Sequence, residues 1–174
     1  MLIVFGGLPG TGKTTLAREL ARRLVAIYLR IDTVEQAIIR SGLLTDPGPA
    51  GYFACYSIAA DNLGLGLTVI ADSVNPLAVT RDAWVDVAKS AGTPFLEIEV
   101  ICSEPTELRR RVESRNADIA GHNLPTWQDV VDHEYEPWAR EHIVIDTATL
   151  SIAQAVEEVI ARIRGSNAAR GSPQ

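Results

Sequence analysis

Five short apolar runs recur along the chain, and each ends where glycine or polar residues begin. The first, LIVF at residues 2–5, contains no polar residue and is followed by two glycines, which is typical of a central strand covered on both faces. We therefore predict five strands, with the first inside a sheet. The runs lie at residues 2–5, 26–31, 67–72, 95–102 and 142–145.

Segments with helical periodicity alternate with these runs. Leu16, Leu20 and Leu24 recur at helical spacing, with arginines on the intervening positions. Strands that alternate with helices predict an α/β fold, in which right-handed crossovers place helices on both faces of a parallel sheet. Periodicity, capping residues and turn residues predict helices over residues 13–24, 33–39, 52–63, 76–91, 105–115, 128–138 and 151–163.

The length and continuity of the chain indicate a single domain. A chain of 174 residues can bury one sizeable core, and no repeat or linker divides residues 1–164. The polar tail GSNAARGSPQ, residues 165–174, has no periodicity. We expect this tail to be flexible and to carry no function.

The strongest chemical signal is GLPGTGKT at residues 7–14, which satisfies GxxxxGK[ST] between a predicted strand and a predicted helix. Its glycines let consecutive N–H groups point into an anion site, and the helix N-terminus adds a positive dipole end. Lys13 is expected on the β- and γ-phosphates and the Thr14 hydroxyl on Mg²⁺. A turn that merely joins strand to helix would need neither residue. The predicted nucleotide-binding residues of the loop are Gly7, Pro9, Gly10, Thr11, Gly12, Lys13, Thr14 and Thr15.

Two aspartates follow predicted strands, where ligands of open parallel sheets gather. Asp72 follows TVIA and is expected to hold Mg²⁺ beside the phosphate loop; a helix cap is the alternative. Asp32 follows YLRI, faces the phosphate site from the acceptor side, and would take a hydroxyl proton as general base. A capping role for Asp32 is an equal alternative.

Arginines supply the remaining candidates. Arg111 and Arg115 share a helix face at i,i+4 spacing, where two cations repel unless an anion such as a nucleotide phosphate lies between them. A solvated face paired with glutamates is the alternative. Arg81 is a weaker candidate, either for an anionic group of the acceptor or for the surface.

Composition excludes several classes. A net charge of −6 argues against a general nucleic-acid binder, although a local basic pocket stays compatible with it. Cys55 and Cys102 both have the sequence context of small buried hydrophobes, which fits a reducing cytoplasm, and no spacing of His and Cys indicates zinc. No apolar run approaches the roughly 20 residues of a membrane span.

Taken together, these motifs resemble the small P-loop kinases, a group that includes chloramphenicol phosphotransferase, gluconate kinase, polynucleotide kinase and the zeta toxins and is often labelled AAA family ATPase. The resemblance covers nearly all of residues 1–164 and is carried by GLPGTGKTTLA, LRID, VIADS, ICSEPTELRRRVESR and IVIDTA. It implies a three-layer P-loop NTPase fold of the nucleoside-kinase type, with a five-stranded parallel sheet and a small lid over about residues 115–128. It further implies ATP and Mg²⁺ as cofactors, and Lys13, Asp32, Arg111 and Arg115 as the catalytic residues.

The expected activity is transfer of the ATP γ-phosphoryl group to a hydroxyl of a small molecule. A polynucleotide 5′-hydroxyl kinase and a nucleotide-binding module without transfer activity are the alternatives. A regulatory GTPase is disfavoured because ICSEPT stands where a guanine-specific loop belongs, and the chain is too short for an oligomeric AAA+ motor. The low charge of YFACYSIAA, residues 52–60, hints at an acceptor that is small and not highly anionic, while the sequence is silent on oligomeric state.

Overall fold

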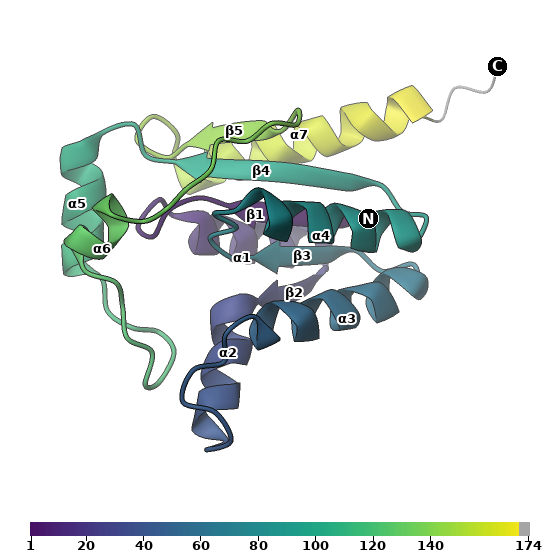
Figure 1. Cartoon of the computed structure of the whole chain (residues 1–174). Coiled ribbons are helices and arrows are strands. Elements are labelled where there is room, and N and C mark those ends of the chain that lie inside the picture. Colours follow the sequence, from purple (N-terminus) through teal and green to yellow (C-terminus); the bar gives the residue numbers. More distant parts are fainter. Residues whose placement is uncertain (171–174) are drawn as a thin grey trace.

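The computed structural model describes residues 1–170, which form a parallel sheet with helices on both sides (Figure 1). The strands are β1 (Leu2–Gly6), β2 (Ile27–Arg30), β3 (Val69–Asp72), β4 (Phe95–Ile101) and β5 (Ile143–Asp146). The helices are α1 (Lys13–Leu24), α2 (Ile31–Arg40), α3 (Ala50–Gly64), α4 (Ala78–Ser90), α5 (Pro105–Ser114), α6 (Trp127–Val131) and α7 (Ile152–Arg170).

The sheet has the strand order β2-β3-β1-β4-β5, and every neighbouring pair is parallel. The predicted five-stranded parallel sheet is thus confirmed, with β1 at its centre. All five residues of β1 are buried, which accounts for its continuous apolar run. Because the strands are parallel, their carboxyl ends meet at one edge, where Arg30 lies beside Asp72 in the register.

Alternate residues of β1 face two different cores. Ile3 and Phe5 pack in a cluster with residues of α1 and α7, whereas Leu2 and Val4 pack with residues of α3 and α4. This is the period of two expected for a strand with both faces covered. The result is the three-layer arrangement that the alternating sequence pattern predicted. Cys55 and Cys102 are buried free thiols, as expected from their apolar context.

Three predicted boundaries are corrected by the structure. The helix α2 begins at Ile31, so Asp32 lies in its first turn and not at the end of the strand. The helix expected over 128–138 occupies only Trp127–Val131, and the chain beyond it runs to α4, where Glu136 N donates to Pro76 O. The last helix continues through residues 165–170, which were predicted to be flexible tail, while residues 171–174 lie outside the described part.

The segments at the carboxyl edge of the sheet form the wall of a site. The phosphate loop follows β1, α2 follows β2, and α5 and α6 project from the same edge (Figure 1). Residues 115–126, which join α5 to α6, are called the lid below. No helix within residues 1–170 is long and apolar enough to cross a bilayer.

Candidate functional site

The phosphate loop adopts the backbone conformation that its glycines allow. Gly7, Gly10 and Gly12 have φ of 132°, 88° and 92°, and a Cβ at Gly7 would collide with the carbonyl oxygen of Val100. Thr11 Oγ1 donates to Leu8 O at 2.9 Å and so closes the loop on itself. The loop therefore leads directly into the first turn of α1, whose N-terminal N–H groups can bind an anion.

A cavity of about 560 Å³ opens in front of this loop and is called the loop cavity here. Its walls come from the loop, α1, the end of β2, α5, the lid and the turn after β5. Five of the lining side chains are cationic, which suits a polyanionic ligand. These cations are Lys13, Arg18, Arg30, Arg111 and Arg115.

Lys13 is the first residue of α1, and its side chain is buried. Burial lowers the pKa of this ammonium group, while the nearby carboxylates of Asp72 and Asp32 act in the opposite direction. Burial thus disfavours the charged form of Lys13, and the charges of Asp72 and Asp32 favour it. A bound phosphate group would favour the charged form further.

Asp72 ends β3 and is 1% exposed. Its Oδ2 accepts a 2.6 Å hydrogen bond from the Tyr28 hydroxyl, whereas its Oδ1 has no partner within the described residues. Burial and the neighbouring Asp72 charge raise the pKa of Tyr28, so the phenol stays a donor. No helix begins until Ala78, which removes the alternative of a helix-capping Asp72.

A magnesium ion fits this arrangement. Asp72 Oδ1 is an oxygen without a partner among the described residues, and Thr14, the second residue of α1, lines the loop cavity. Magnesium is commonly held by one or two protein oxygens together with substrate phosphates. Among the residues that the structure describes, no group of three or more His, Cys, Asp or Glu side chains could hold a metal. The ion would therefore depend on the bound nucleotide for most of its ligands.

Asp32 is held in place by the residue before its helix. Arg30 Nη2 lies 3.2 Å from Asp32 Oδ2, and the Arg30 side chain is 8% exposed. No side chain caps α2, so the structure gives Asp32 no capping hydrogen bond. The Asp32 charge also acts against the lowering of the pKa values of Lys13 and Arg115.

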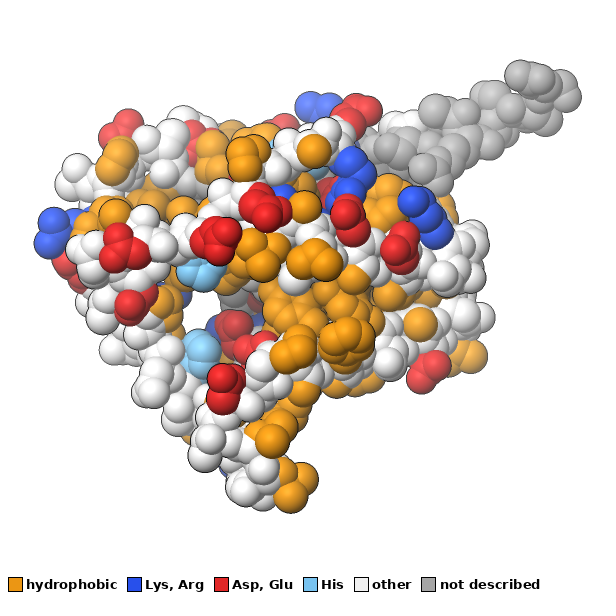
Figure 2. Space-filling model, viewed as in Figure 1, with side chains coloured by type: hydrophobic (Ala, Val, Ile, Leu, Met, Phe, Trp, Pro, Cys, Tyr) orange, Lys and Arg blue, Asp and Glu red, His pale blue; other side chains and the backbone are white. Residues whose placement is uncertain are grey.

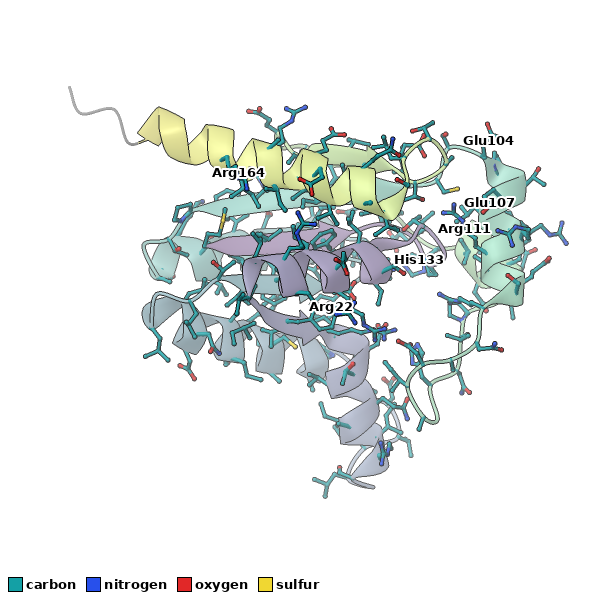
Figure 3. All side chains as sticks on the ribbon, turned by 180° about the vertical axis from the view of Figure 1, so that it is seen from behind. Arg22, Glu104, Glu107, Arg111, His133 and Arg164 are labelled. Atoms are coloured by element: carbon teal, nitrogen blue, oxygen red, sulfur yellow. The ribbon has the colours of Figure 1, made fainter. Side chains whose placement is uncertain are left out.

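Arg111 links α5 to the turn after β5. Its Nε donates to Glu107 at 2.7 Å, and its Nη1 donates to Thr147 Oγ1 at 2.7 Å. The Thr147 hydroxyl in turn donates to Thr11 O at 2.7 Å, so α5, β5 and the phosphate loop are joined through two side chains. In Figure 3 the Arg111 side chain points from α5 toward the body of the domain. Arg111 therefore lines the loop cavity, as predicted for a phosphate contact, and also pairs with Glu107, as the alternative predicted.

Arg115 follows α5 and lines the same cavity. Its Nε is buried and finds no hydrogen-bond partner in the described part of the chain. Burial lowers the pKa of this guanidinium group, with Arg30 adding to the effect and Asp32 opposing it. A buried donor without a partner is costly, so Arg115 is the residue of the site that most clearly requires an anionic ligand.

The sequence analysis missed a contact that ties the lid down. Asp118, in the lid, accepts from Arg30 Nη1 at 2.8 Å and from Arg18 Nη2 at 2.6 Å. The lid therefore rests on the end of β2 and on α1 across the mouth of the loop cavity. Arg30 belongs to the LRID motif, but no feature of the sequence indicates that Arg18 or Arg30 contacts an aspartate so far along the chain.

We predict that Asp118→Asn loosens the lid. The substitution removes the charge that both arginines share, so backbone amides of residues 115–126 should exchange hydrogen several-fold faster, while the rest of the domain stays unchanged. Asp86→Asn, which makes the same change on an exposed position of α4, is the control. Equal exchange in the two variants would show that the contact does not hold the lid.

The same contact predicts a pH dependence. Partial burial alone would raise the pKa of Asp118, but the hydrogen bonds from Arg30 and Arg18 lower it from 3.8 to about 2. Because the pKa of Asp118 is lowered by its contacts with the two arginines, its ionised form stabilises the closed lid at any pH above the ordinary pKa of an aspartate. This stabilisation is lost as the pH falls from the ordinary pKa through the lowered one. Lid exchange, corrected for its intrinsic pH dependence, should stay constant down to about pH 4 and rise between pH 3.8 and about 2.

Arg81 does not reach the site. Its guanidinium group is buried, donates to Glu136 O at 2.9 Å and to Pro137 O at 3.1 Å, and lies 4.7 Å from the ring centroid of Trp138. These contacts hold the segment before β5 against α4. The prediction that Arg81 meets either the acceptor or the surface is therefore wrong, because its donors serve backbone carbonyls.

Comparison with known proteins agrees with this geometry. A probable adenylyl-sulfate kinase from Pseudomonas aeruginosa is 26% identical over 168 residues, which cover 91% of this chain and 74% of the relative. A putative kinase from Chloroflexus aurantiacus superimposes with a TM-score of 0.71 at 21% identity, covering 92% of this chain and 96% of the other. The APS kinase of Mycobacterium tuberculosis, in complex with AMPPNP and APS, gives a TM-score of 0.64 at 19% identity, covering 94% and 96%. At such identities the two solved structures show the shared fold alone.

A family model described as an AAA domain matches residues 2–133, which is most of the chain. This stretch runs from β1 through the phosphate loop, α2 and the lid to just past α6. The chain therefore belongs to this AAA-domain family, and it resembles the small P-loop kinases, as its motifs predicted.

Proposed function

We propose that this protein is an ATP- and magnesium-dependent kinase that transfers the γ-phosphoryl group to a hydroxyl of a small molecule. The observation that carries the proposal is the division of charge around the loop cavity. Lys13 and Arg115, whose Nε has no partner among the described residues, line the cavity where phosphates would lie, and the Asp32 carboxylate is paired with Arg30 of the same cavity. The kinase relatives support the reaction class.

Each residue has a role that follows from its position. The N–H groups of the loop and Lys13 would bind the β- and γ-phosphates, and Arg115 would neutralise charge on the transferring group. Arg111, already fixed by Glu107 and Thr147, would border the nucleotide without further ordering. The lid, tied down by Asp118, would exclude water and so limit hydrolysis.

Thr14 and Asp72 would hold magnesium, directly or through water. When bound, this ion would neutralise phosphate charge and help to orient the β- and γ-phosphates.

Asp32 would act on the acceptor. It would accept the hydroxyl proton as the acceptor oxygen forms its bond to the γ-phosphorus and as the bond from that phosphorus to the β–γ bridging oxygen breaks. ADP then leaves with the bridging oxygen, and the proton on Asp32 passes to solvent. Arg30, which is hydrogen-bonded to Asp32, would orient the carboxylate before the reaction.

The test is acceptor-dependent release of ADP. The protein is incubated with ATP and magnesium, with and without a panel of hydroxylated metabolites, antibiotics, nucleosides and 5′-hydroxyl oligonucleotides. We expect ADP release above the background of hydrolysis with at least one small molecule, together with a phosphorylated product detected by mass spectrometry. ATP binding without release by any panel member would instead indicate a nucleotide-binding module, and release by oligonucleotides alone would indicate a polynucleotide kinase.

A further inference from the structure

A second cavity, of about 380 Å³, lies between α2, residues 45–48 and the lid residues 121–123. We call it the α2 cavity. Figure 2 shows an opening in this part of the molecule, between the lid and the α2–α3 region, with acidic and histidine side chains at its edge. The volume is within the range of small-molecule sites.

One side chain of the α2 cavity is buried and has no partner. Gln36, which lines the cavity, is 7% exposed, and its amide makes no hydrogen bond with any residue that the structure describes. A Cβ at Gly121 would lie 3.2 Å from Gln36 Nε2, so the tip of the lid closely covers the amide. The amide atoms are not sealed from the cavity, so a polar group of a ligand in this cavity would find their donors and acceptor free.

The charges of the two cavities are opposite. The α2 cavity is lined by the carboxylates Glu35 and Asp46, with His122 as its basic residue and neither Lys nor Arg among the described residues that line it. The loop cavity, by contrast, carries one lysine and four arginines. An anion such as adenylyl sulfate would meet two carboxylates in the α2 cavity, whereas a cation would be stabilised by both.

Asp32 is in the first turn of α2, three residues before Glu35 of the α2 cavity, and is paired with Arg30 of the loop cavity. Its charge acts on the pKa of Lys13 and on the pKa of Glu35. Burial, and then the Asp32 and Asp46 charges, raise the pKa of Glu35. A ligand that carries a positive charge would relieve this repulsion, and its hydroxyl could then reach Asp32.

We propose that the α2 cavity binds the phosphoryl acceptor, and that this acceptor is a small hydroxylated molecule with a protonated amine, of the amino-alcohol or amino-sugar class. The ammonium group pairs with Glu35 and Asp46, a polar group of the ligand completes the hydrogen bonds of Gln36, and a hydroxyl extends to Asp32. This inference rests on the proposed phosphotransfer, because it identifies the acceptor of that reaction.

The experiment compares sets of ligands of similar size and hydroxyl content that carry a positive, a zero or a negative charge. Glucosamine, glucose and glucuronate form one set, and serinol, glycerol and glycerate form another. Binding to the protein loaded with magnesium and a non-hydrolysable ATP analogue is measured by calorimetry, and ADP release is measured in parallel with ATP. We expect the amine of at least one set to bind about tenfold or more tightly than its neutral counterpart, as a charge-assisted contact allows.

Glu35→Gln should abolish this preference, whereas Glu141→Gln, the same change at an exposed position outside the cavity, should preserve it. The inference would be overturned if glucuronate or glycerate bound more tightly than the amines, or if no amine bound. It would also be overturned if the preference for the amine survived in Glu35→Gln. Amine binding without ADP release would support the α2 cavity as a site while contradicting phosphotransfer. ADP release driven by glucuronate or glycerate would support phosphotransfer while contradicting the α2 cavity as the site of a cationic acceptor.

Discussion

Lys13→Met is expected to lower kcat/KM for phosphoryl transfer by about 10³-fold, the size of effect that follows the loss of one preorganised charge-stabilising donor. The Lys13 ammonium group is buried at the start of α1, between the phosphate loop and the carboxylates of Asp72 and Asp32. Of the cavity arginines, Arg18 alone shares α1 with Lys13, and its guanidinium group is already paired with Asp118, so it does not replace the lysine at the phosphate loop. The measurement is ADP release with a verified acceptor, with nucleotide affinity determined separately by calorimetry.

The chain supplies its own control for this substitution. Lys89, the only other lysine, is exposed near the end of α4, so Lys89→Met makes the same chemical change away from the site. We expect this variant to keep its activity and both variants to retain the wild-type circular dichroism spectrum. Activity within threefold of wild type in Lys13→Met would contradict the assignment of the loop cavity to the transferring phosphates.

Asp32→Asn is expected to lower kcat by about 10²- to 10⁴-fold, the range for removal of a general base. The amide keeps the shape of the side chain and can still accept a hydrogen bond from Arg30, but it cannot take a proton. Nucleotide affinity should therefore change little, which separates loss of the base from loss of the fold. Single-turnover measurements with ATP and acceptor, followed over pH, give the rate of the chemical step directly.

The control for this change is Asp86→Asn, which should leave kcat as it is. Asp32 makes no capping hydrogen bond but pairs with the buried Arg30, so the variant should unfold cooperatively at a modestly lower denaturant concentration than the wild type. If Asp32→Asn transfers phosphoryl groups at an unchanged rate, its role is to hold Arg30 and not to activate the acceptor.

The parts of the site that the sequence could predict are those built from neighbouring residues. Three glycines, Lys13 and Thr14 are consecutive or nearly so, and their backbone conformation follows from local sterics between a strand and a helix. The sheet was predictable for a similar reason, because continuous apolar runs mark strands buried on both faces. The ends of the elements differed from the prediction, most of all at α6, which ends at Val131, and at α7, which continues to Arg170.

Contacts between distant segments were not predictable. Asp118 belongs to a segment with the composition of a loop, and its partners Arg18 and Arg30 lie 100 and 88 residues earlier in the chain. Arg81 was misassigned because a sequence carries no sign that a guanidinium group will be saturated by the carbonyls of residues 136 and 137. Gln36 was overlooked because its burial depends on the position of the lid.

The order of the strands has a consequence for how such a protein can diversify. Residues 31–68 leave the sheet at the end of β2 and return at β3, the strand beside it, so this excursion has both its anchor points on adjacent strands. It contains α2 and α3 and no part of the phosphate loop, which follows β1. Changes within this excursion would therefore alter the α2 cavity and the surroundings of Asp32 together, while the phosphate loop and the strands β1, β4 and β5 stay the same.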